Sequence, residues 1–359
     1  GWNALTSTTT GAGNTAVGRE ALILNTTGAG NAGFGRETLR TNTTGSSNTA
    51  LGKDALFSNT TASSNTAVGT TALYANTTGA NNVAVGFQAL DANTTAEGNV
   101  AVGKGSLSTN ILGSKSVAIG MEALATQNPA SAVAMYNVAV GHDAGYAITT
   151  GTNNTLIGGR AGDALTDADF NVAVGNSALS ADTLGSSSIA IGHAALENQN
   201  FTTATNSLNV AIGHVAGQAV TTGVNNTLLG HRSGDALTDA DSNVAVGESA
   251  LSSDTLGSGS VAIGDSALYA QNFTSAATSF NTAVGFAAGN STTTGQSNVF
   301  VGYYSGQFNS TGYANTFVGS GSGSGVTGAK TTGNNNTAVG AGAGNDLQGA
   351  ASDNTFLGG

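Results

Sequence analysis

A short phrase recurs along the whole chain and restricts what it can fold into. Its five-residue core is Asn or Ser, then Thr, Val, Ile or Ala, then usually Ala, then a large apolar residue, then Gly. The core begins at residues 14, 31, 48, 65, 82, 99, 116, 137, 154, 171, 188, 209, 226, 243, 260, 281, 298, 315, 336 and 354. Most successive starts differ by 17, four differ by 21, and the last two differ by 18. A fixed internal period of this size predicts a repeat architecture.

A 17-residue period is too short for a helix-turn-helix repeat and suits one coil of a β-solenoid, with two short strands each followed by a turn. Thr-Ala-Val-Gly is a β-branched run that ends in Gly, and Asn-Thr-Thr-Gly has turn chemistry. Hydrophobic residues make up 39% of the chain, so a core is available. We therefore predict an all-β fold, a parallel β-solenoid of about 20 coils.

The columns of the repeat indicate the environment of each position, counting Asn14 as position 1. Position 5 is always Gly, and position 4 is always large and apolar, as in Val17 and Phe34, so we expect position 4 to face a core. Position 6 varies widely and is expected to face solvent. Stacking places equivalent residues about 4.8 Å apart. We therefore expect the position-1 asparagines to form a ladder of side-chain amides, as in Asn14, Asn31, Asn48 and Asn65.

Position 3 is apolar as well, although it alternates with positions 2 and 4 along the strand. It is Ala in most copies and Leu156, Leu228, Phe300, Phe317 or Phe356 in five others. The strand is therefore expected to be buried on both faces. A single thin 17-residue coil cannot cover both faces, so we predict a homo-oligomer in which another copy of the chain supplies the cover.

The repeat describes one solenoid segment over residues 1–359. Residues 1–115 are regular 17-residue coils, 116–280 contain 72-residue super-repeats, and 281–359 are rich in Gly and aromatic residues. The chain begins and ends within a coil, so we expect it to be a segment of a longer fibre protein.

Composition excludes several classes of partner. The formal net charge is -11, and nucleic acid is excluded because phosphate binding requires a basic face. No apolar run approaches the roughly 20 residues that cross a bilayer, so we expect no membrane insertion by this segment. There is no cysteine, which excludes disulfides and thiolate metal sites.

Catalysis requires a nucleophile, base or metal set that breaks the repeat at one place, and no such place is visible. We predict a non-enzymatic protein with no catalytic residues, no metal site and no cofactor. Position 6 contains all four histidines, His142, His193, His214 and His231. A stacked column of imidazoles could bind a metal, or the histidines could have arisen by drift at a permissive surface position. The second interpretation is favoured.

The repeated "GDALTDAD" is the best ionic candidate. It contains Asp163, Asp167 and Asp169, and again Asp235, Asp239 and Asp241, followed by Asn171 or Asn243. Closely spaced carboxylates in a loop resemble oxygen ligands for calcium. Duplication of the 72-residue block explains the second copy without a function. A solvated acidic turn is favoured, and calcium stays open.

Three other clusters have a functional and a structural interpretation, and the structural one is favoured each time. The first cluster contains Arg19, Arg36 and Lys53 beside Glu20, Glu37 and Asp54. It could form an anion-binding stripe, which is the functional interpretation, or a ladder of salt bridges, which is the structural one. The second is the sequons at Asn25, Asn42 and Asn59: glycosylation sites, or turns. The third is Phe300, Tyr303, Tyr304, Phe308, Tyr313 and Phe317: a surface that stacks on sugar rings, or core filling where Leu becomes Gly.

Several phrases resemble known fibre repeats. "NVAVGHDAG", "SVAIGMEAL" and "SIAIGHAAL" resemble the head repeats of YadA-like trimeric autotransporter adhesins. "TNTTGSSNTALGKDAL" resembles repeats of bacteriophage tail fibres that end in a self-cleaving chaperone domain. The resemblance covers essentially the whole chain. It implies a left-handed parallel β-roll, a homotrimer, and extracellular attachment of a virion or a bacterial cell to a host receptor or glycan.

The expected function is a structural and adhesive shaft. Its longer coils, such as residues 127–130 and 200–203, are the expected binding places because insertions project from a solenoid. One alternative is ice binding by a column of hydroxyls at Thr27, Thr44, Thr78 and Thr95. The other is a glycan-cleaving tailspike, which requires a pair of carboxylates across a groove.

Overall fold

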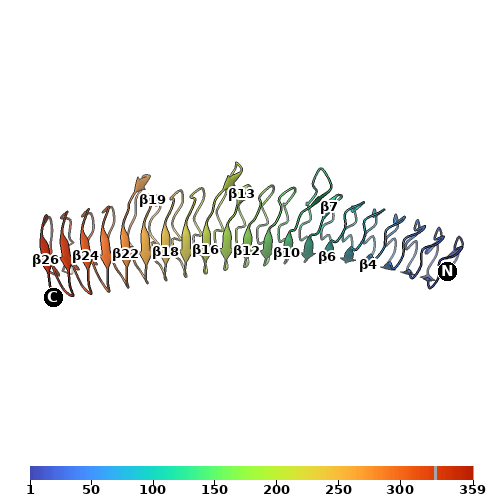
Figure 1. Ribbon diagram of the computed structural model, residues 1–359, viewed down its shortest axis with the longest axis horizontal. Coiled ribbons are helices and arrows are strands. Elements are labelled where there is room, and N and C mark those ends of the chain that lie inside the picture. The colour runs from blue at the N-terminus through green and yellow to red at the C-terminus, as the bar shows by residue number, and fades with distance from the viewer. Residues whose placement is uncertain (327–329, 359) are drawn as a thin grey trace. The chain divides into compact units, whose positions relative to one another are not determined.

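The computed structural model describes residues 1–326 and 330–358. The chain divides into two compact units, residues 1–176 and 177–359, which are described separately. Each unit is a parallel β-solenoid in which most coils repeat with the 17-residue period, and no helix occurs among the described residues (Figure 1). The predicted all-β solenoid of about twenty coils is therefore confirmed.

The first unit carries one three-residue strand in each of ten successive coils. These strands are β1 (Thr15–Val17), β2 (Ala32–Phe34), β3 (Thr49–Leu51), β4 (Thr66–Val68), β5 (Val83–Val85), β6 (Val100–Val102), β8 (Val117–Ile119), β10 (Val138–Val140), β11 (Thr155–Ile157) and β12 (Val172–Val174). Two shorter strands, β7 (Gly113–Ser114) and β9 (Val133–Ala134), pair with each other.

The second unit repeats this plan. Its three-residue strands are β14 (Ile189–Ile191), β16 (Val210–Ile212), β17 (Thr227–Leu229), β18 (Val244–Val246), β20 (Val261–Ile263), β22 (Thr282–Val284), β23 (Val299–Val301), β24 (Thr316–Val318), β25 (Thr337–Val339) and β26 (Thr355–Leu357). The shorter pairs are β13 (Gly185–Ser186) with β15 (Thr205–Asn206), and β19 (Gly257–Ser258) with β21 (Ala277–Thr278).

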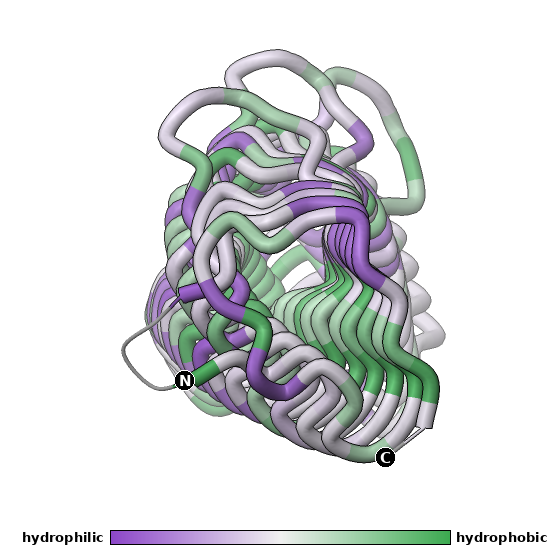
Figure 2. Tube along the Cα trace, turned by 90° about the vertical axis from the view of Figure 1, so that its left-hand side faces the viewer, coloured by the Kyte–Doolittle hydropathy of each residue, from purple (hydrophilic) through white to green (hydrophobic). Residues whose placement is uncertain are grey.

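Successive strands pair in parallel with the register set by the repeat. Thr49 lies beside Thr66, and Ala50 lies beside Ala67. Residues of like hydropathy therefore align from coil to coil (Figure 2). Gly at position 5 follows from the same stacking, because a Cβ on Gly52 would lie 2.6 Å from the backbone of Gly69 in the next coil.

The expectation of two strands in every coil is wrong, because the segment after position 5 is a series of turns. Its residues at positions 7 and 9 have left-handed backbones, as in Asp54 (φ 60°) and Leu56 (φ 52°). A left-handed conformation costs a non-glycine residue roughly 1–2 kcal/mol. Leu56 is fully buried, and burying a leucine side chain contributes about 1.5–3 kcal/mol. Burial therefore offsets the strain.

The interior of the coil is formed by positions 3, 8 and 9. Ala50, Ala55 and Leu56, which occupy these positions in one coil, have no exposed surface. Position 4 lies on the outer face instead, as the 49% exposure of Leu51 shows. Position 4 was expected to face a core. Within this chain it does not, because the side chains of a strand alternate and position 3 takes the inner side.

Where position 9 is Gly, larger residues at neighbouring positions fill the core. A Cβ on Gly145 would lie 2.7 Å from Leu156 and 3.2 Å from Ile148. A Cβ on Gly306 would lie 2.3 Å from the ring of Phe300, and Phe300 and Phe317 are both fully buried. The prediction that these aromatic residues fill the core is confirmed for Phe300 and Phe317.

The predicted asparagine ladder is present at position 1, where Asn48 Nδ2 donates to Asn31 Oδ1 at 3.1 Å, and backbone groups take part in it as well. Asn31 Oδ1 accepts a hydrogen bond from the backbone N–H of Asn48 at 3.0 Å, and Asn31 Nδ2 donates to the carbonyl of Gly45 at 2.8 Å. The amide thus links one coil to the next and closes its own coil. Nearly all of these side chains are completely buried.

A second ladder at position 12 was not predicted. Asn59 Nδ2 donates to Asn42 Oδ1 at 2.7 Å and to the carbonyl of Ala62 at 3.0 Å, and Asn76 Nδ2 donates to Asn59 Oδ1 at 3.0 Å. From Asn42 to Asn93, each amide of this column donates to the asparagine of the preceding coil. The signal was the constant Asn of the Asn-Thr-Thr phrase, which sequence reasoning assigned to turn formation alone.

Longer coils form loops that extend beyond their neighbours, near β7 in the first unit and near β13 and β19 in the second (Figure 1). In the second unit a buried carboxylate holds one of these loops. Asp182 Oδ1 accepts hydrogen bonds from the backbone N–H groups of Gly185 and Phe201, both at 3.0 Å, and Asp182 Oδ2 accepts one from Gln199 at 2.6 Å. Burial raises the pKa of Asp182 and outweighs these hydrogen bonds, which lower it.

Replacing Asn59 by Ala should destabilise the full chain. The change removes three hydrogen bonds and leaves the buried Asn42 Oδ1 without its donor, which costs about 1–3 kcal/mol. We expect a lower Tm in thermal unfolding followed by circular dichroism. Thr61→Ala, which alters an exposed side chain near the same corner, is the control and should change stability by no more than about 0.5 kcal/mol. Equal melting temperatures for the two variants would contradict a stabilising ladder.

Asp182→Asn should change how stability depends on pH. A raised pKa in the folded chain favours the protonated carboxyl, so this residue stabilises the fold below the ordinary value of 3.8 and loses that contribution as pH rises through the folded pKa. We expect the Tm of the variant, relative to the parent, to increase between about pH 3 and pH 7. Asn110 occupies the same repeat position in the first unit, so the fold accepts Asn there. A Tm difference that is constant with pH would overturn this account.

Candidate functional site

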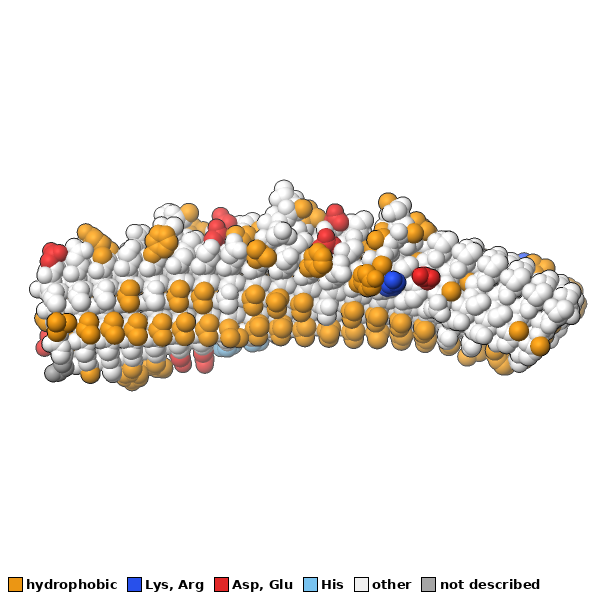
Figure 3. All heavy atoms as spheres, in the orientation of Figure 1, with side chains coloured by type: hydrophobic (Ala, Val, Ile, Leu, Met, Phe, Trp, Pro, Cys, Tyr) orange, Lys and Arg blue, Asp and Glu red, His pale blue; other side chains and the backbone are white. Residues whose placement is uncertain are grey.

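The most extensive functional candidate is an exposed apolar stripe, formed in each unit by positions 2 and 4 of the three-residue strands. Position 4 is apolar in every coil. In the first unit the exposed members include Val17 at 55%, Phe34 at 40%, Leu51 at 49%, Ile119 at 40% and Ile157 at 40%. In the second they include Leu229 at 45%, Ile263 at 38% and Val339 at 39%. Hydrophobic side chains form rows that follow the coils of each unit (Figure 3).

This stripe is unusual for a surface. Single exposed apolar residues are common, but contiguous exposed apolar patches mark interaction sites. Position 2 adds to the stripe where it is Val or Ile, as in Val83, Val100 and Ile189, all of which are half-buried. The sequence predicted apolar residues on both faces of the strand. It expected position 4 to face a core, whereas position 3 faces the interior of the coil and position 4 lies on the outer face.

The four histidines lie on the surface at position 6, as predicted. In the second unit His193, His214 and His231 stack, with ring centroids 5.2 Å and 5.3 Å apart. In the first unit His142 Nδ1 lies 2.9 Å from Asp143 Oδ2. Among residues 1–326 and 330–358, no group of three His, Cys, Asp or Glu side chains is placed to hold a metal ion.

The carboxylates of the repeated acidic phrase are directed to separate protein partners. Asp163 forms a salt bridge with Arg160 at 3.1 Å, and Asp235 forms one with Arg232 at 3.0 Å. Asp169 Oδ1 accepts hydrogen bonds from the backbone and hydroxyl of Thr152 at 2.6 and 2.9 Å. Asp167 and Asp239 accept hydrogen bonds from Thr150 and Thr222. The arrangement matches the favoured acidic turn, because these carboxylates are engaged by side chains and backbone of the protein itself.

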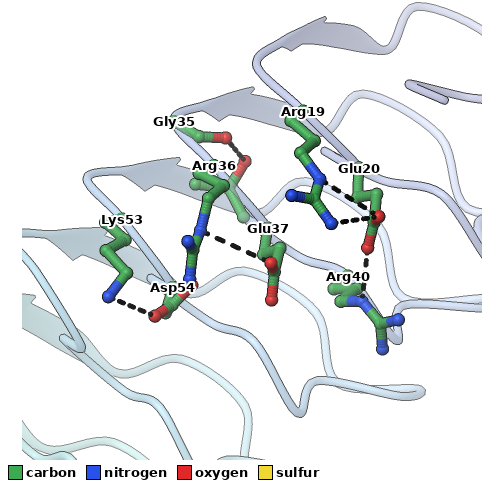
Figure 4. Close-up of polar contacts among 9 residues, drawn as sticks. Arg19, Glu20, Gly35, Arg36, Glu37, Arg40, Lys53 and Asp54 are labelled. Carbon is green, nitrogen blue, oxygen red and sulfur yellow. Dashed lines mark hydrogen bonds and ion pairs between the residues drawn. The ribbon is translucent and has the colours of Figure 1, made fainter. Parts of the chain in front are cut away.

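The basic residues of the first coils form the predicted ladder of salt bridges (Figure 4). Arg19 lies 3.1 Å from Glu20, Arg36 lies 3.4 Å from Glu37, and Lys53 lies 3.5 Å from Asp54. Arg40 also binds Glu20 at 3.1 Å, and hydrogen bonds from Arg40 and then Arg19 lower the pKa of Glu20. The neighbouring acids neutralise the cations, which argues against an anion stripe.

The sequons at Asn25, Asn42 and Asn59 are fully buried. Their amides serve the position-12 ladder, so the folded chain does not expose them for glycosylation. The threonines after them are divided by role. Those at position 13, such as Thr43, donate their hydroxyl to the next coil, whereas Thr27, Thr44, Thr78 and Thr95 at position 14 are exposed.

The aromatic residues of the second unit are also divided. Phe300 and Phe317 are buried, whereas Tyr303 is 54% and Tyr313 is 51% exposed. Tyr303 and Tyr304 lie with ring centroids 4.2 Å apart beside Phe286. Tyr304 and Phe308 are half-buried. Core filling therefore explains only part of this cluster.

The longer coils place short exposed segments at the ends of their loops. Thr202, Thr203 and Ala204 are exposed in one loop of the second unit, and Thr274, Ser275 and Ala276 are exposed in the other. Phe201 and Phe273 are buried at the base of these loops, at 6% and 5% exposure. The expectation that Phe201 belongs to an exposed binding segment is therefore wrong, because its ring packs against the coil.

No helix among the described residues is long and apolar enough to span a bilayer.

Removal of calcium should leave stability unchanged. The acidic side chains of the repeated phrase already have protein partners, so a cation has no gathered set of oxygen ligands to bind. We expect the same Tm with excess chelator and with added calcium chloride. An increase in Tm on adding calcium that the chelator reverses would show that these turns bind the ion.

Comparison with known proteins adds no further identification: no protein-family model matches the chain, and no curated protein matches it at a significant level.

Proposed function

We propose that this chain is the non-enzymatic, structural and adhesive shaft of a trimeric extracellular fibre. In this proposal the coils form a left-handed β-roll, and three copies pack side by side. The fibre attaches a virion, as a tail fibre, or a bacterial cell, as an adhesin, to a host or surface. The resemblance to adhesin head and tail-fibre repeats motivates this assignment.

The observation that carries the proposal is the apolar stripe. A row of apolar side chains, mostly Val, Leu and Ile, recurs once in every coil of each unit. Leaving such a row in water is costly, since each buried Å² of apolar surface contributes about 25 cal/mol. Another protein surface that covers it must therefore extend along many coils.

A second copy of this chain is the surface that fits best. Its coils have the same rise, so its own stripe presents one apolar side chain at every level where the first chain presents one. Closed symmetric assemblies of identical chains are the common outcome when a surface is complementary to itself. A threefold axis would bury position 4 of each copy at the centre of the fibre.

In this proposal, the surfaces that attach to the host are the loops outside the apolar stripe. The loops that include β7, β13 and β19 extend from the coil away from the three-residue strands within their own units (Figure 1). Loops on a rigid scaffold are the usual carriers of recognition. The shaft would thus use the apolar stripe for assembly, and its other faces would stay exposed and available for attachment.

Charge placed in the stripe should dissociate the assembly. We expect the parent chain to sediment at about three times its mass of 34.8 kDa. In the triple variant Leu51→Lys, Val68→Lys and Val85→Lys, three charges would be buried at the interface. We expect a shift toward the monomer, because unpaired buried charge costs several kcal/mol.

The matched control carries the same charge change on another face of the same coils. Thr61→Lys, Thr78→Lys and Thr95→Lys replace exposed threonines and should leave the sedimentation of the parent unchanged. Circular dichroism confirms that both variants keep the β-fold. A parent chain that sediments as a folded monomer would refute the proposed assembly.

A further inference from the structure

A hollow in the first unit is not accounted for by the repeat. It has a volume of about 440 Å³, within the range of small-ligand sites, and lies over the coils that contain residues 88–146. Its walls include Gln88, Asp91, Lys104, Glu122 and Tyr146. It is separate from the apolar stripe, because its lining comes from positions 6, 7, 10 and 11 of the repeat.

Small side chains in two successive coils create this hollow. Position 10 is Asp91, Ser108, Ala125 and Tyr146 in four consecutive coils, whereas earlier coils carry Arg40, Phe57 and Tyr74 there. Position 7 is Gly105 between Gln88 and Glu122. The small residues leave the floor open, and the larger ones at either end close it. Four coils at about 4.8 Å spacing make it roughly 14 Å long.

The walls combine hydrogen-bonding groups of both kinds with one aromatic ring. Asp91 and Glu122 supply carboxylate oxygens, Lys104 supplies an ammonium group, and Gln88 supplies an amide. Ser108, Thr109 and Thr126 add hydroxyls. The Tyr146 side chain is 40% exposed, so part of the ring is available for stacking.

Asp91 places a half-buried carboxylate in the wall of the hollow. Its Oδ1 atom is shielded from solvent and has no hydrogen-bond partner among the described residues. Burial raises the pKa of Asp91. Asp163 and Asp235, at the same repeat position in other coils, also have a shielded Oδ1, so this atom does not mark the hollow. Asp91 lines the hollow, and a ligand there would meet its carboxylate at the oxygen that is not shielded.

We propose that this hollow binds one or two sugar rings of a glycan. Sugar hydroxyls donate to Asp91 and Glu122 and accept from Lys104 and Gln88, while the apolar face of a ring stacks on Tyr146. The proposal rests on the attachment role proposed above and names the class of ligand and its place.

The charges of the hollow favour a sugar over simpler ligands. A lone cation would be repelled by Lys104, and a lone anion would be repelled by Asp91 and Glu122. A purely apolar ligand would leave these charged groups buried without partners, which is unfavourable. A polyhydroxylated ring satisfies donors and acceptors together. The two carboxylates also make cleavage of the ligand an outcome to examine.

The test uses the full chain on a printed array of defined oligosaccharides, followed by titration of the strongest binder. Ala125→Tyr should fill the hollow and weaken binding at least tenfold, and other coils carry Tyr at this position without loss of the fold. Asp91→Asn keeps the shape and should also weaken binding. Ser180→Tyr makes the same kind of change at position 10 outside the hollow and should bind as the parent does.

If the oligosaccharide is recovered intact, the hollow binds the sugar without cleaving it, as proposed. If shorter products are recovered, the hollow is a catalytic site, and its assignment as a binding site is wrong. Absence of binding to the array by the parent, or equal binding by Ala125→Tyr, refutes the inference. Sedimentation of the same samples separates the two proposals. A trimer that binds no sugar refutes only the hollow, and a monomer whose binding is lost in Ala125→Tyr refutes only the trimeric shaft.

Discussion

Hydrogen bonding between coils, in a register set by the repeat, is the constraint on which the structure depends. Each three-residue strand is too short to be stable alone, and it persists because an equivalent strand pairs with it from the adjacent coil. Once that register is set, each side chain lies over its equivalent. A residue type that stacks well on itself is therefore favoured in a buried column.

The two asparagine columns show how polar residues are accommodated in such an interior. Asn48 and Asn59 both donate to the carbonyl of Ala62, so one backbone oxygen joins two corners of the same coil. Their own oxygens accept hydrogen bonds from the next coil. Buried amides such as Asn48 and Asn59 are acceptable because their hydrogen bonds are satisfied, and they add specificity that an apolar core of Ala and Leu would lack.

Stacking also explains why functional candidates appear on the surface as rows. The apolar stripe, the charged ladder beginning at Arg19 and the stacked rings of His193 and His214 are all single positions of the repeat followed through successive coils. Local departures create the less regular features. Small residues at Ser108 and Ala125 open the hollow, and added residues form the protruding loops.

The sequence by itself determined the class of fold, the register between coils and the position of the solvent-facing column, because a periodic chain that pairs in parallel places Gly52 beside Gly69 whatever the coil's shape. The tertiary structure alone decided which apolar position faces inward. Val68 and Ala67 are both apolar, and only the path of the backbone after Gly69 places alanine inside, where space is limited, and valine outside. It also decided the environment of Asp91 and Asp182, because burial depends on neighbours from other coils that the local sequence does not reveal.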